Sequence, residues 1–255
     1  MMELELKSPQ DLERMRRAGR IVAEVLRKLQ EEVRPGMTTL ELDRIAEDMT
    51  RKRNGVPAFK GYQVGTKVFP ASLCVSVNEE VVHGIPSSRV LREGDIVSLD
   101  FGVLADGYYG DAAVTIPVGN ISDSAMHLLS TTKKALWEGI RAMRVDNRLG
   151  DLSHTIQKTA EAAGLSVVRE FVGHGIGRRL HEEPQVPNFG EPGKGRLLRE
   201  GMVLAIEPML NLGGPGVVLK EDGWTAVTMD GSLSAHFEHS VAVTANGSLV
   251  LTELN

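Results

Sequence analysis

The sequence predicts an α+β fold built from two related halves, and two internal repeats are the main reason. The segment Leu91–Asp100 (LREGDIVSLD) returns as Leu198–Glu207 (LREGMVLAIE), with four identical residues, an apolar run and an acid at the same place. The corner His83–Pro86 (HGIP) returns as His174–Gly177 (HGIG). Each half contains two helical patterns and several β-rich runs, without strict alternation of strand and helix. Two copies are too few for a solenoid, so we expect the halves to face one site.

The composition is that of a globular protein. With 255 residues, 42% of them hydrophobic and 25% charged, the chain can build one large domain with a sizeable core or two small ones. The repeat favours a single domain, residues 1–255, with halves of roughly 1–120 and 121–255. The helix entry at Met37–Leu42 has a looser echo at Asn147–Leu152 in the second half.

Charge and cysteine content exclude several classes of protein. A net charge of -5 gives no basic footprint, so nucleic acid is not expected as the main partner. The apolar runs fall short of a membrane span, and the first residues lack the apolar region of a signal peptide. Cys74 is the one cysteine, which rules out a disulfide within the chain and fits a reducing compartment. We therefore expect a cytoplasmic protein without a membrane anchor.

Four helices are expected from capping signals and apolar periodicity. Ser8-Pro9-Gln10-Asp11 is typical of a helix start, with a capping serine, proline at the first helical position and an acid in the first turn. The other helix ends are marked by threonine or serine caps and by glycine stops. The expected helices run from Pro9 to before Arg34, from Thr38 or Thr39 to Asn54-Gly55, from Ser122 or Asp123 to about Met143, and from about Leu149 to Ala163.

A central hairpin is the clearest β signal. The apolar, β-rich runs Ile96–Gly102 and Asp111–Val118 flank the step Asp106-Gly107, which favours a hairpin turn. Asp100 lies in the first run and Asp111 opens the second, so the hairpin can bring their carboxylates close together. Two acids on a largely apolar hairpin are unfavourable unless a cation compensates them.

The rest of the chain divides into loops and shorter strands. Pro57–Pro70 is expected to be a loop, Gly173–Gly177 a tight glycine-rich segment, and Glu182–Arg196 a surface loop with three prolines. The remaining expected strands are Leu73–Val77, Leu165–Val168, Met202–Ile206, Val217–Leu219, Trp224–Met229, Phe237–Thr244 and Leu249–Leu251.

Acids and histidines recur at strand ends and glycine corners, and together they suggest a metal site. These residues are His83, Asp100, Asp111, His174, His181, Glu207 and Glu238. A mixed set of carboxylates and imidazoles suits Mn, Fe, Co or Zn better than a structural zinc site made of thiolates. The four carboxylates carry four negative charges, which two divalent cations would balance. Two such ions can activate water for amide hydrolysis.

Each of these residues has an ordinary structural interpretation when it is taken alone. Asp100 and Asp111 could form turns, and His174 could lie in a surface loop. Glu207 is harder to explain in this way, because it ends an apolar run without a helical or turn reason to be acidic. Jointly, and with the repeat, the residues favour a dinuclear metal site.

The sequence does not support a phosphate loop, an H-E-x-x-H zinc motif or a cysteine nucleophile. The glycines of Gly173–Gly177 lack the spacing of a phosphate loop. His181 and Glu182 begin like H-E-x-x-H, but Gln185 stands at the second histidine and Pro184 would break the required helix. Cys74 in an apolar strand favours packing over a nucleophilic role.

Five segments, taken together and in order, resemble type I methionine aminopeptidase over nearly the whole chain. They are VNEEVVHGIP, GDIVSLDFGVLADGYYGD, GHGIGRRLHEEP, GMVLAIEP and DGWTAVTMDGSLSAHFEHSVAVT. The resemblance implies the pita-bread fold, in which two pseudo-symmetric halves surround a central antiparallel sheet with helices on the outside. It also implies removal of the initiator methionine from nascent proteins and peptides when the second residue is small.

The resemblance assigns roles residue by residue. It implies two divalent ions (Co, Mn, Fe or Zn) held by Asp100, Asp111, His174, Glu207 and Glu238, with Asp111 and Glu238 bridging both. A metal-activated hydroxide would attack the peptide carbonyl, and Glu207 would accept and relay the proton. His181 would hydrogen-bond the carbonyl, and His83 would contact the scissile amide nitrogen.

The resemblance also implies a methionine pocket, partners and rival functions. Residues around the methionine side chain would be Phe59, Tyr62, Phe69, Cys74 and Trp224, each of which could equally be ordinary core. The implied partners are nascent polypeptide N-termini, with contact to the ribosome left open, and the implied state is a monomer. Two alternatives stay open: an Xaa-Pro aminopeptidase or prolidase, and a non-catalytic binding protein of the same fold.

Overall fold

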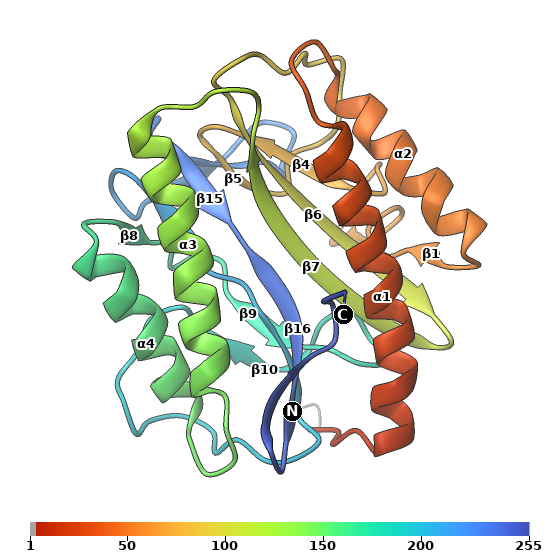
Figure 1. Ribbon diagram of the computed structural model, residues 1–255, viewed down its shortest axis with the longest axis vertical. Coiled ribbons are helices and arrows are strands. Elements are labelled where there is room, and N and C mark those ends of the chain that lie inside the picture. The colour runs from red at the N-terminus through yellow and green to blue at the C-terminus, as the bar shows by residue number, and fades with distance from the viewer. Residues whose placement is uncertain (1–3, 255) are drawn as a thin grey trace.

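A curled antiparallel sheet runs through the middle of the molecule, with helices on one of its faces (Figure 1). The computed structural model describes residues 4–254. Within this range the helices are α1 (Pro9–Glu32), α2 (Thr39–Lys52), α3 (Asp123–Ala142) and α4 (Leu149–Ala162). These bounds confirm the predicted helices. In the same range, none of the helices is long and apolar enough to cross a membrane.

The strands are short except at the centre of the sheet. In chain order they are β1 (Val56–Pro57), β2 (Gln63–Val64), β3 (Lys67–Val68), β4 (Cys74–Val77), β5 (Glu80–Val82), β6 (Ile96–Ala105), β7 (Tyr108–Pro117), β8 (Ser166–Val167), β9 (Gly173–Gly175), β10 (Glu182–Val186), β11 (Val203–Ile206), β12 (Met209–Asn211), β13 (Val217–Leu219), β14 (Ala226–Thr228), β15 (Ser234–His236), β16 (Glu238–Thr244) and β17 (Gly247–Val250).

The main sheet combines strands from both halves of the chain. Its order is β1-β6-β7-β16-β11-β9-β10, with β4 also paired to β6 and β17 to β16. The junction between the halves is the antiparallel pair of β7 and β16, where Ala113 lies opposite Glu238 and Ala112 opposite His239. The strands that carry or immediately precede Asp100, Asp111, His174, Glu207 and Glu238 are therefore all connected through this sheet.

The central hairpin is confirmed, and its strands are longer than predicted. Asp106 and Gly107 both have positive φ, at 51° and 78°, which is the conformation of the two-residue turn that matches strand twist. Ala105 pairs directly with Tyr108 across this turn, so β6 and β7 continue to its edge.

The two halves use equivalent contacts, which makes them pseudo-symmetric. In the first half the Leu91 amide donates to the Met37 carbonyl at 2.8 Å, and Thr38 forms a bridge with Val90. In the second half the equivalent contacts join Leu198 to Asn147, also at 2.8 Å, and Arg148 to Leu197. The repeated LREG segments and the two helix entries therefore occupy matching places in the two halves.

Each half has its own apolar core between helices and sheet. In the first half, one face of β6 and β7 packs on α1, and in the second half β11 and β16 pack on α3 and α4. The first-half contacts include Val22, Val25, Leu29, Leu99, Phe101 and Val103. Since side chains alternate along a strand, Asp100 points to the opposite face of the sheet, away from the helices.

The glycine-rich segment at Gly173–Gly177 and the loop predicted at Glu182–Arg196 each contribute a strand that was not predicted. Gly173–Gly175 is strand β9, where glycine allows close approach of neighbouring backbones. A Cβ at Gly173 would lie 2.3 Å from the Ala205 carbonyl oxygen, and one at Gly175 would lie 2.2 Å from that of Glu183. Residues 182–186 form β10, which tolerates its proline because it lies at the edge of the sheet.

Other differences come from very short strands. The loop predicted at Pro57–Pro70 contains part of β1 and the small hairpin β2–β3. Strands β5, β12 and β15 were not predicted, because three residues are too few to show an alternating pattern.

Helix α1 packs against β7 through a glycine contact, and this contact gives the first prediction. A Cβ at Gly110 would lie 2.7 Å from the Gly19 backbone nitrogen. We expect Gly110→Ala to push α1 away from the sheet and to lower the free energy of unfolding by about 1–3 kcal/mol. Urea denaturation measures this change. Gly216→Ala is the control, because its Cβ would meet only the Met229 side chain at 3.5 Å and beyond. Equal effects of the two changes would contradict the close-packing explanation.

Candidate active site

The register of β6, β7 and β16 brings three acids to one face of the sheet. Asp100 on β6 lies opposite Ala113 on β7, and Ala113 lies opposite Glu238 on β16. Paired residues share a face, and so do residues two apart on one strand. Asp111 is two residues before Ala113 and therefore joins Asp100 and Glu238 on the face that the helices leave free.

The second half adds its ligands by the same rule. Ala205 on β11 pairs with Ser240 on one side and with His174 on the other. Glu207 follows two residues after Ala205, so it lies on the same face as His174. Five strands, or the residue directly after one, thus deliver four carboxylates and an imidazole to a single patch.

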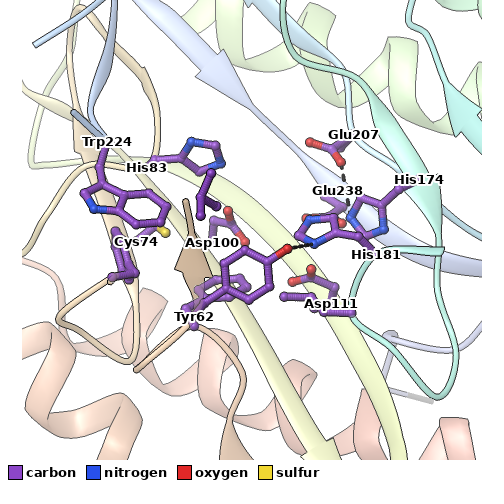
Figure 2. A pocket seen from close by; sticks show the side chains of 14 residues that line it. Tyr62, Cys74, His83, Asp100, Asp111, His174, His181, Glu207, Trp224 and Glu238 are labelled. Carbon is purple, nitrogen blue, oxygen red and sulfur yellow. Dashed lines mark hydrogen bonds and ion pairs between the residues drawn. The ribbon is translucent and has the colours of Figure 1, made fainter. Parts of the chain in front are cut away.

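All the predicted site residues line one cavity of about 300 Å³. Figure 2 shows the labelled side chains gathered around this space. The cavity is lined by Phe59, Tyr62, Val64, Phe69, Cys74, His83, Asp100, Asp111, His174, Leu180, His181, Glu207, Trp224 and Glu238. Val64 and Leu180 add apolar surface, and Val64 had not been predicted.

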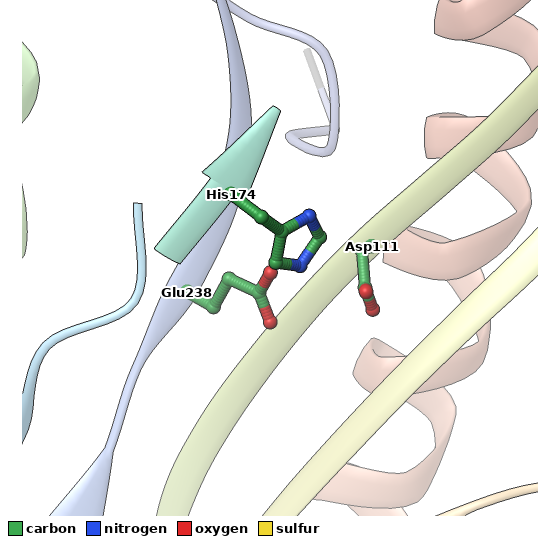
Figure 3. A group of neighbouring side chains, drawn as sticks. All are labelled: Asp111, His174 and Glu238. Atoms are coloured by element: carbon green, nitrogen blue, oxygen red, sulfur yellow. The ribbon is translucent and has the colours of Figure 1, made fainter. Parts of the chain in front are cut away.

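Asp111, His174 and Glu238 form the tightest group (Figure 3). One ligand atom from each lies within 4.8 Å of the others, and all three residues are buried. Within residues 4–254, buried oxygens of Asp100, Asp111 and Glu238 have no hydrogen-bond partner. Unsatisfied buried carboxylate oxygens are strongly unfavourable, and a cation between them would satisfy them. The donor set therefore fits a hard or borderline divalent metal.

The carboxylates raise one another's pKa. Burial raises the pKa of Asp100 to about 7. Burial, with the charges of neighbouring acids, raises the pKa of Asp111, Glu207 and Glu238 well above the usual range. The cluster as it stands therefore favours bound protons, and a metal ion would compete with those protons for the same oxygens.

His174 is arranged as a neutral ligand. Its Nδ1 lies 2.9 Å from the Gly175 carbonyl oxygen, to which it can donate, so Nε2 is left with a free lone pair. That Nε2 lies 3.6 Å from Glu207 Oε1. Burial and the nearby His181 lower the pKa of His174 to about 3, which keeps the ring neutral and able to bind a metal.

His83 and His181 reach the cavity from different halves of the chain. His83 follows β5 and has φ of 59°, a left-handed conformation that is uncommon for a residue with a side chain. Its ring packs edge-on against Phe171, with centroids 5.4 Å apart. His181 precedes β10, is exposed at the cavity mouth, and lies 4.3 Å from the His174 ring between centroids. Both imidazoles can therefore meet a molecule bound at the acids.

The apolar end of the cavity is formed by aromatic side chains and Cys74. Phe69 and Trp224 meet edge to face with ring centroids 5.3 Å apart. Phe59 lies against Gly102, the residue opposite Asp111 in the hairpin, so this apolar surface adjoins the acids directly. Burial raises the pKa of the Cys74 thiol, consistent with packing and not with a nucleophile.

His236 is a neighbour of the site that sequence reasoning missed. It is buried, neither ring nitrogen has a hydrogen-bond partner among the described residues, and Nε2 lies 3.7 Å from Glu207 Oε2. The available signal was its spacing of two residues from Glu238, which is the spacing of side chains on one face of a strand.

The shifted carboxyl groups predict how metal affects stability at different pH. Because their folded pKa values lie above those of the unfolded chain, metal-free protein loses stability as pH rises through the folded values. A bound divalent ion would balance the charge. We expect a fixed Mn²⁺ concentration, about a hundred times the Kd at pH 8, to raise the melting temperature of chelator-treated protein by roughly 5–10 °C at pH 8. The same concentration should raise it by less at pH 6, because protons compete with the metal for the carboxylates.

The matched variant for that measurement is Asp111→Asn, which removes one carboxylate of the tightest group. It should reduce the rise at pH 8 more than at pH 6. A rise that is larger at pH 6 than at pH 8 would contradict the role given to these carboxylates.

Comparison with known proteins agrees with this geometry. The model of metallopeptidase family M24 matches residues 13–245. A methionine aminopeptidase from Clostridium perfringens is 54% identical over 247 residues, which cover 97% of this chain and 98% of that protein. Methionine aminopeptidase 1 from Bacillus subtilis is 51% identical, with the same coverage.

Solved structures give the same result and confirm the pita-bread fold. The crystal structure of methionine aminopeptidase from Thermotoga maritima aligns with a TM-score of 0.96 at 48% identity, over 99% of this chain and 100% of that one. Prolidase from Pyrococcus furiosus aligns with a TM-score of 0.77 at 21% identity, over 98% of this chain but 66% of its own, and so shows the shared fold alone. The chain belongs to metallopeptidase family M24 and, within it, to the methionine aminopeptidases.

Proposed function

We propose that this protein is an enzyme that removes the N-terminal methionine from nascent proteins and peptides whose second residue is small. The observation that carries the proposal is the single cavity in which an acid cluster adjoins an aromatic, apolar end. Relatives that are about half identical over nearly the whole chain are methionine aminopeptidases, which supports the same activity.

The acid cluster would hold two divalent metal ions. Asp100, Asp111, His174, Glu207 and Glu238 would hold these ions. Two divalent cations balance the four carboxylates, and the unpartnered oxygens support their presence. When bound, such ions polarise a carbonyl and lower the pKa of water near them.

Glu207 is proposed to accept the proton from the attacking water and pass it to the leaving amine. Burial and the neighbouring acids raise the pKa of its carboxyl, so it holds a proton more readily than an exposed glutamate. Its two oxygens face different imidazoles, those of His174 and His236. The Asn188 amide donates to its backbone carbonyl at 2.9 Å and fixes the chain at this point.

The two other histidines are proposed to handle the peptide bond. His181, exposed at the mouth, would donate to the scissile carbonyl oxygen as negative charge develops there. His83 would contact the scissile amide nitrogen and assist its departure. Their positions at the same cavity, one from each half, support this division of roles.

The apolar end is proposed to bind the methionine side chain. Methionine is unbranched and its thioether packs well against aromatic rings. Phe59, Tyr62, Phe69, Cys74 and Trp224 supply such a surface. Gly65 and Thr66 form the turn of the β2–β3 hairpin, whose Val64 lines the cavity, so this hairpin would help to shape one wall.

We also propose the domain organisation, location and oligomeric state of the enzyme. Residues 1–255 would act as one metallo-aminopeptidase domain, because strands of both halves pair in the main sheet. It would work in the cytoplasm as a monomer, close to the ribosome where N-termini emerge.

The choice of substrate tests the proposal. Protein stripped with chelator and reloaded with Mn²⁺ or Co²⁺ should release methionine from a Met-Ala-Ser peptide and leave a peptide that begins Gly-Pro intact. Quantifying the free amino acids measures both reactions. Cleavage of the proline peptide alone would favour an Xaa-Pro aminopeptidase. Metal binding without cleavage of either peptide would favour a non-catalytic protein.

A substitution at Glu207 tests the mechanism. Glu207→Gln keeps the shape of the side chain but cannot accept a proton, so kcat should fall by about 10²- to 10⁴-fold. Steady-state kinetics on the Met-Ala-Ser peptide measures the loss, and thermal melting checks the fold. Glu200→Gln makes the same change at an exposed position and should leave kcat unchanged. Full activity of Glu207→Gln would remove Glu207 from the reaction.

A further inference from the structure

Tyr62 contacts more than the methionine pocket, since its hydroxyl is bonded to one of the two reaction histidines. The Tyr62 hydroxyl oxygen lies 2.7 Å from His181 Nδ1, as the dashed line in Figure 2 shows. The two rings are tilted by 60°, with centroids 5.3 Å apart. Tyr62 comes from the first half of the chain and His181 from the second, so this bond crosses the cavity mouth.

An exposed histidine needs such a bond to hold one orientation. His181 is exposed, and an unrestrained side chain there would exchange between rotamers and between its two neutral tautomers. In its neutral form the imidazole ring carries a proton on only one of its two nitrogens. Which nitrogen carries it is decided by the partner of the other.

The tyrosine hydroxyl is the natural donor in this pair. Burial raises the pKa of Tyr62, so its hydroxyl keeps its proton. A phenol is more acidic than a neutral imidazole N–H, so the favourable direction is from the hydroxyl to a bare Nδ1. The proton of His181 then resides on Nε2, where it is free to be donated to a bound molecule.

The backbone around Tyr62 connects it to the side-chain pocket. The Tyr62 amide donates to the Phe59 carbonyl at 2.8 Å, and the Phe69 amide donates to the Tyr62 carbonyl, also at 2.8 Å. Both phenylalanines line the apolar end of the cavity. The segment that would touch the methionine side chain thus also holds the residue that would touch the carbonyl.

We propose that Tyr62 is a positioning residue, whose hydroxyl donates to Nδ1 of His181 and so presents the Nε2 proton to the carbonyl oxygen of the scissile peptide. The proposal rests on the role given to His181 above. It adds that the first half of the chain sets the tautomer and direction of a donor supplied by the second half. Binding of the methionine side chain in the apolar end of the cavity would then favour the correct orientation of the His181 Nε2–H.

Kinetics of Tyr62→Phe separate positioning from binding. This change keeps the ring in the pocket and removes only the hydroxyl. Losing an oxyanion donor entirely costs about 10²- to 10³-fold in kcat, so loss of its orientation alone should cost roughly 10-fold, with KM within about twofold of the unchanged value. Tyr109→Phe removes the same group from a half-buried tyrosine of the same apolar cluster and should change neither constant. A rise in KM with unchanged kcat would overturn the proposal.

Nuclear magnetic resonance reads the tautomer directly and does not depend on turnover. The zinc-loaded, full-length protein labelled with ¹⁵N-histidine should show His181 as a single Nε2–H tautomer, with its signals assigned by their absence in His181→Ala. Tyr62→Phe should give a mixture of tautomers. An Nδ1–H tautomer in the unchanged protein would overturn the proposal.

The two measurements also distinguish the positioning role of Tyr62 from the catalytic role proposed for His181. If His181→Ala kept full kcat while the spectra showed the expected tautomers, the hydrogen bond would stand and the catalytic role of His181 would fail. If His181→Ala lost activity but Tyr62→Phe changed neither kcat nor the tautomer, the positioning role of Tyr62 would fail alone.

Discussion

Repulsion among four carboxylates on one face of a sheet is the constraint on which this structure depends. Asp100, Asp111, Glu207 and Glu238 line one cavity, and three of them have buried oxygens that no described residue hydrogen-bonds. An apolar sheet would not hold such a group without a counter-charge. The stability of the sheet is therefore tied to the same cations that the proposed chemistry needs.

The main sheet separates the acids from the apolar core by placing them on opposite faces. One face of the sheet meets the helices through aliphatic and aromatic side chains, in one core for each half. The other carries the acids and their cavity. Strict alternation along β6 and β7 keeps these environments apart, so Leu99 and Phe101 are buried among helices although Asp100 stands between them.

Much of this could be predicted from the sequence, and the reasons are local. Neighbouring residues alone are enough to recognise the turn at Asp106-Gly107, the helix caps at Ser8 and Thr38, and the repeated LREG segments. Every residue predicted for the site lines the one cavity, although the role of each remains a proposal. Strand β9 was missed, because glycines that allow close packing look in sequence like glycines that allow a turn.

His236 and the Tyr62–His181 bond were missed for a different reason. His236 stands within a segment already rich in polar residues, and only the structure shows that its ring is buried with no hydrogen-bond partner among residues 4–254. Tyr62 and His181 are 119 residues apart, so no local pattern could join them. Long-range pairs of this kind depend on the curl of the sheet, which the order of elements does not specify.

The pairing of β7 with β16 has a consequence for how the molecule matures. Asp111 and Glu238 meet across this junction, near the middle and the end of the chain. A ribosome must therefore synthesise the chain beyond Glu238 before the tightest group of ligands can assemble. Contacts of such sequence separation form late in folding, because a long loop must first be closed. An incomplete chain would expose Asp100 and Asp111 without their counterparts, so capture of metal would coincide with the last step of folding and would mark the finished enzyme.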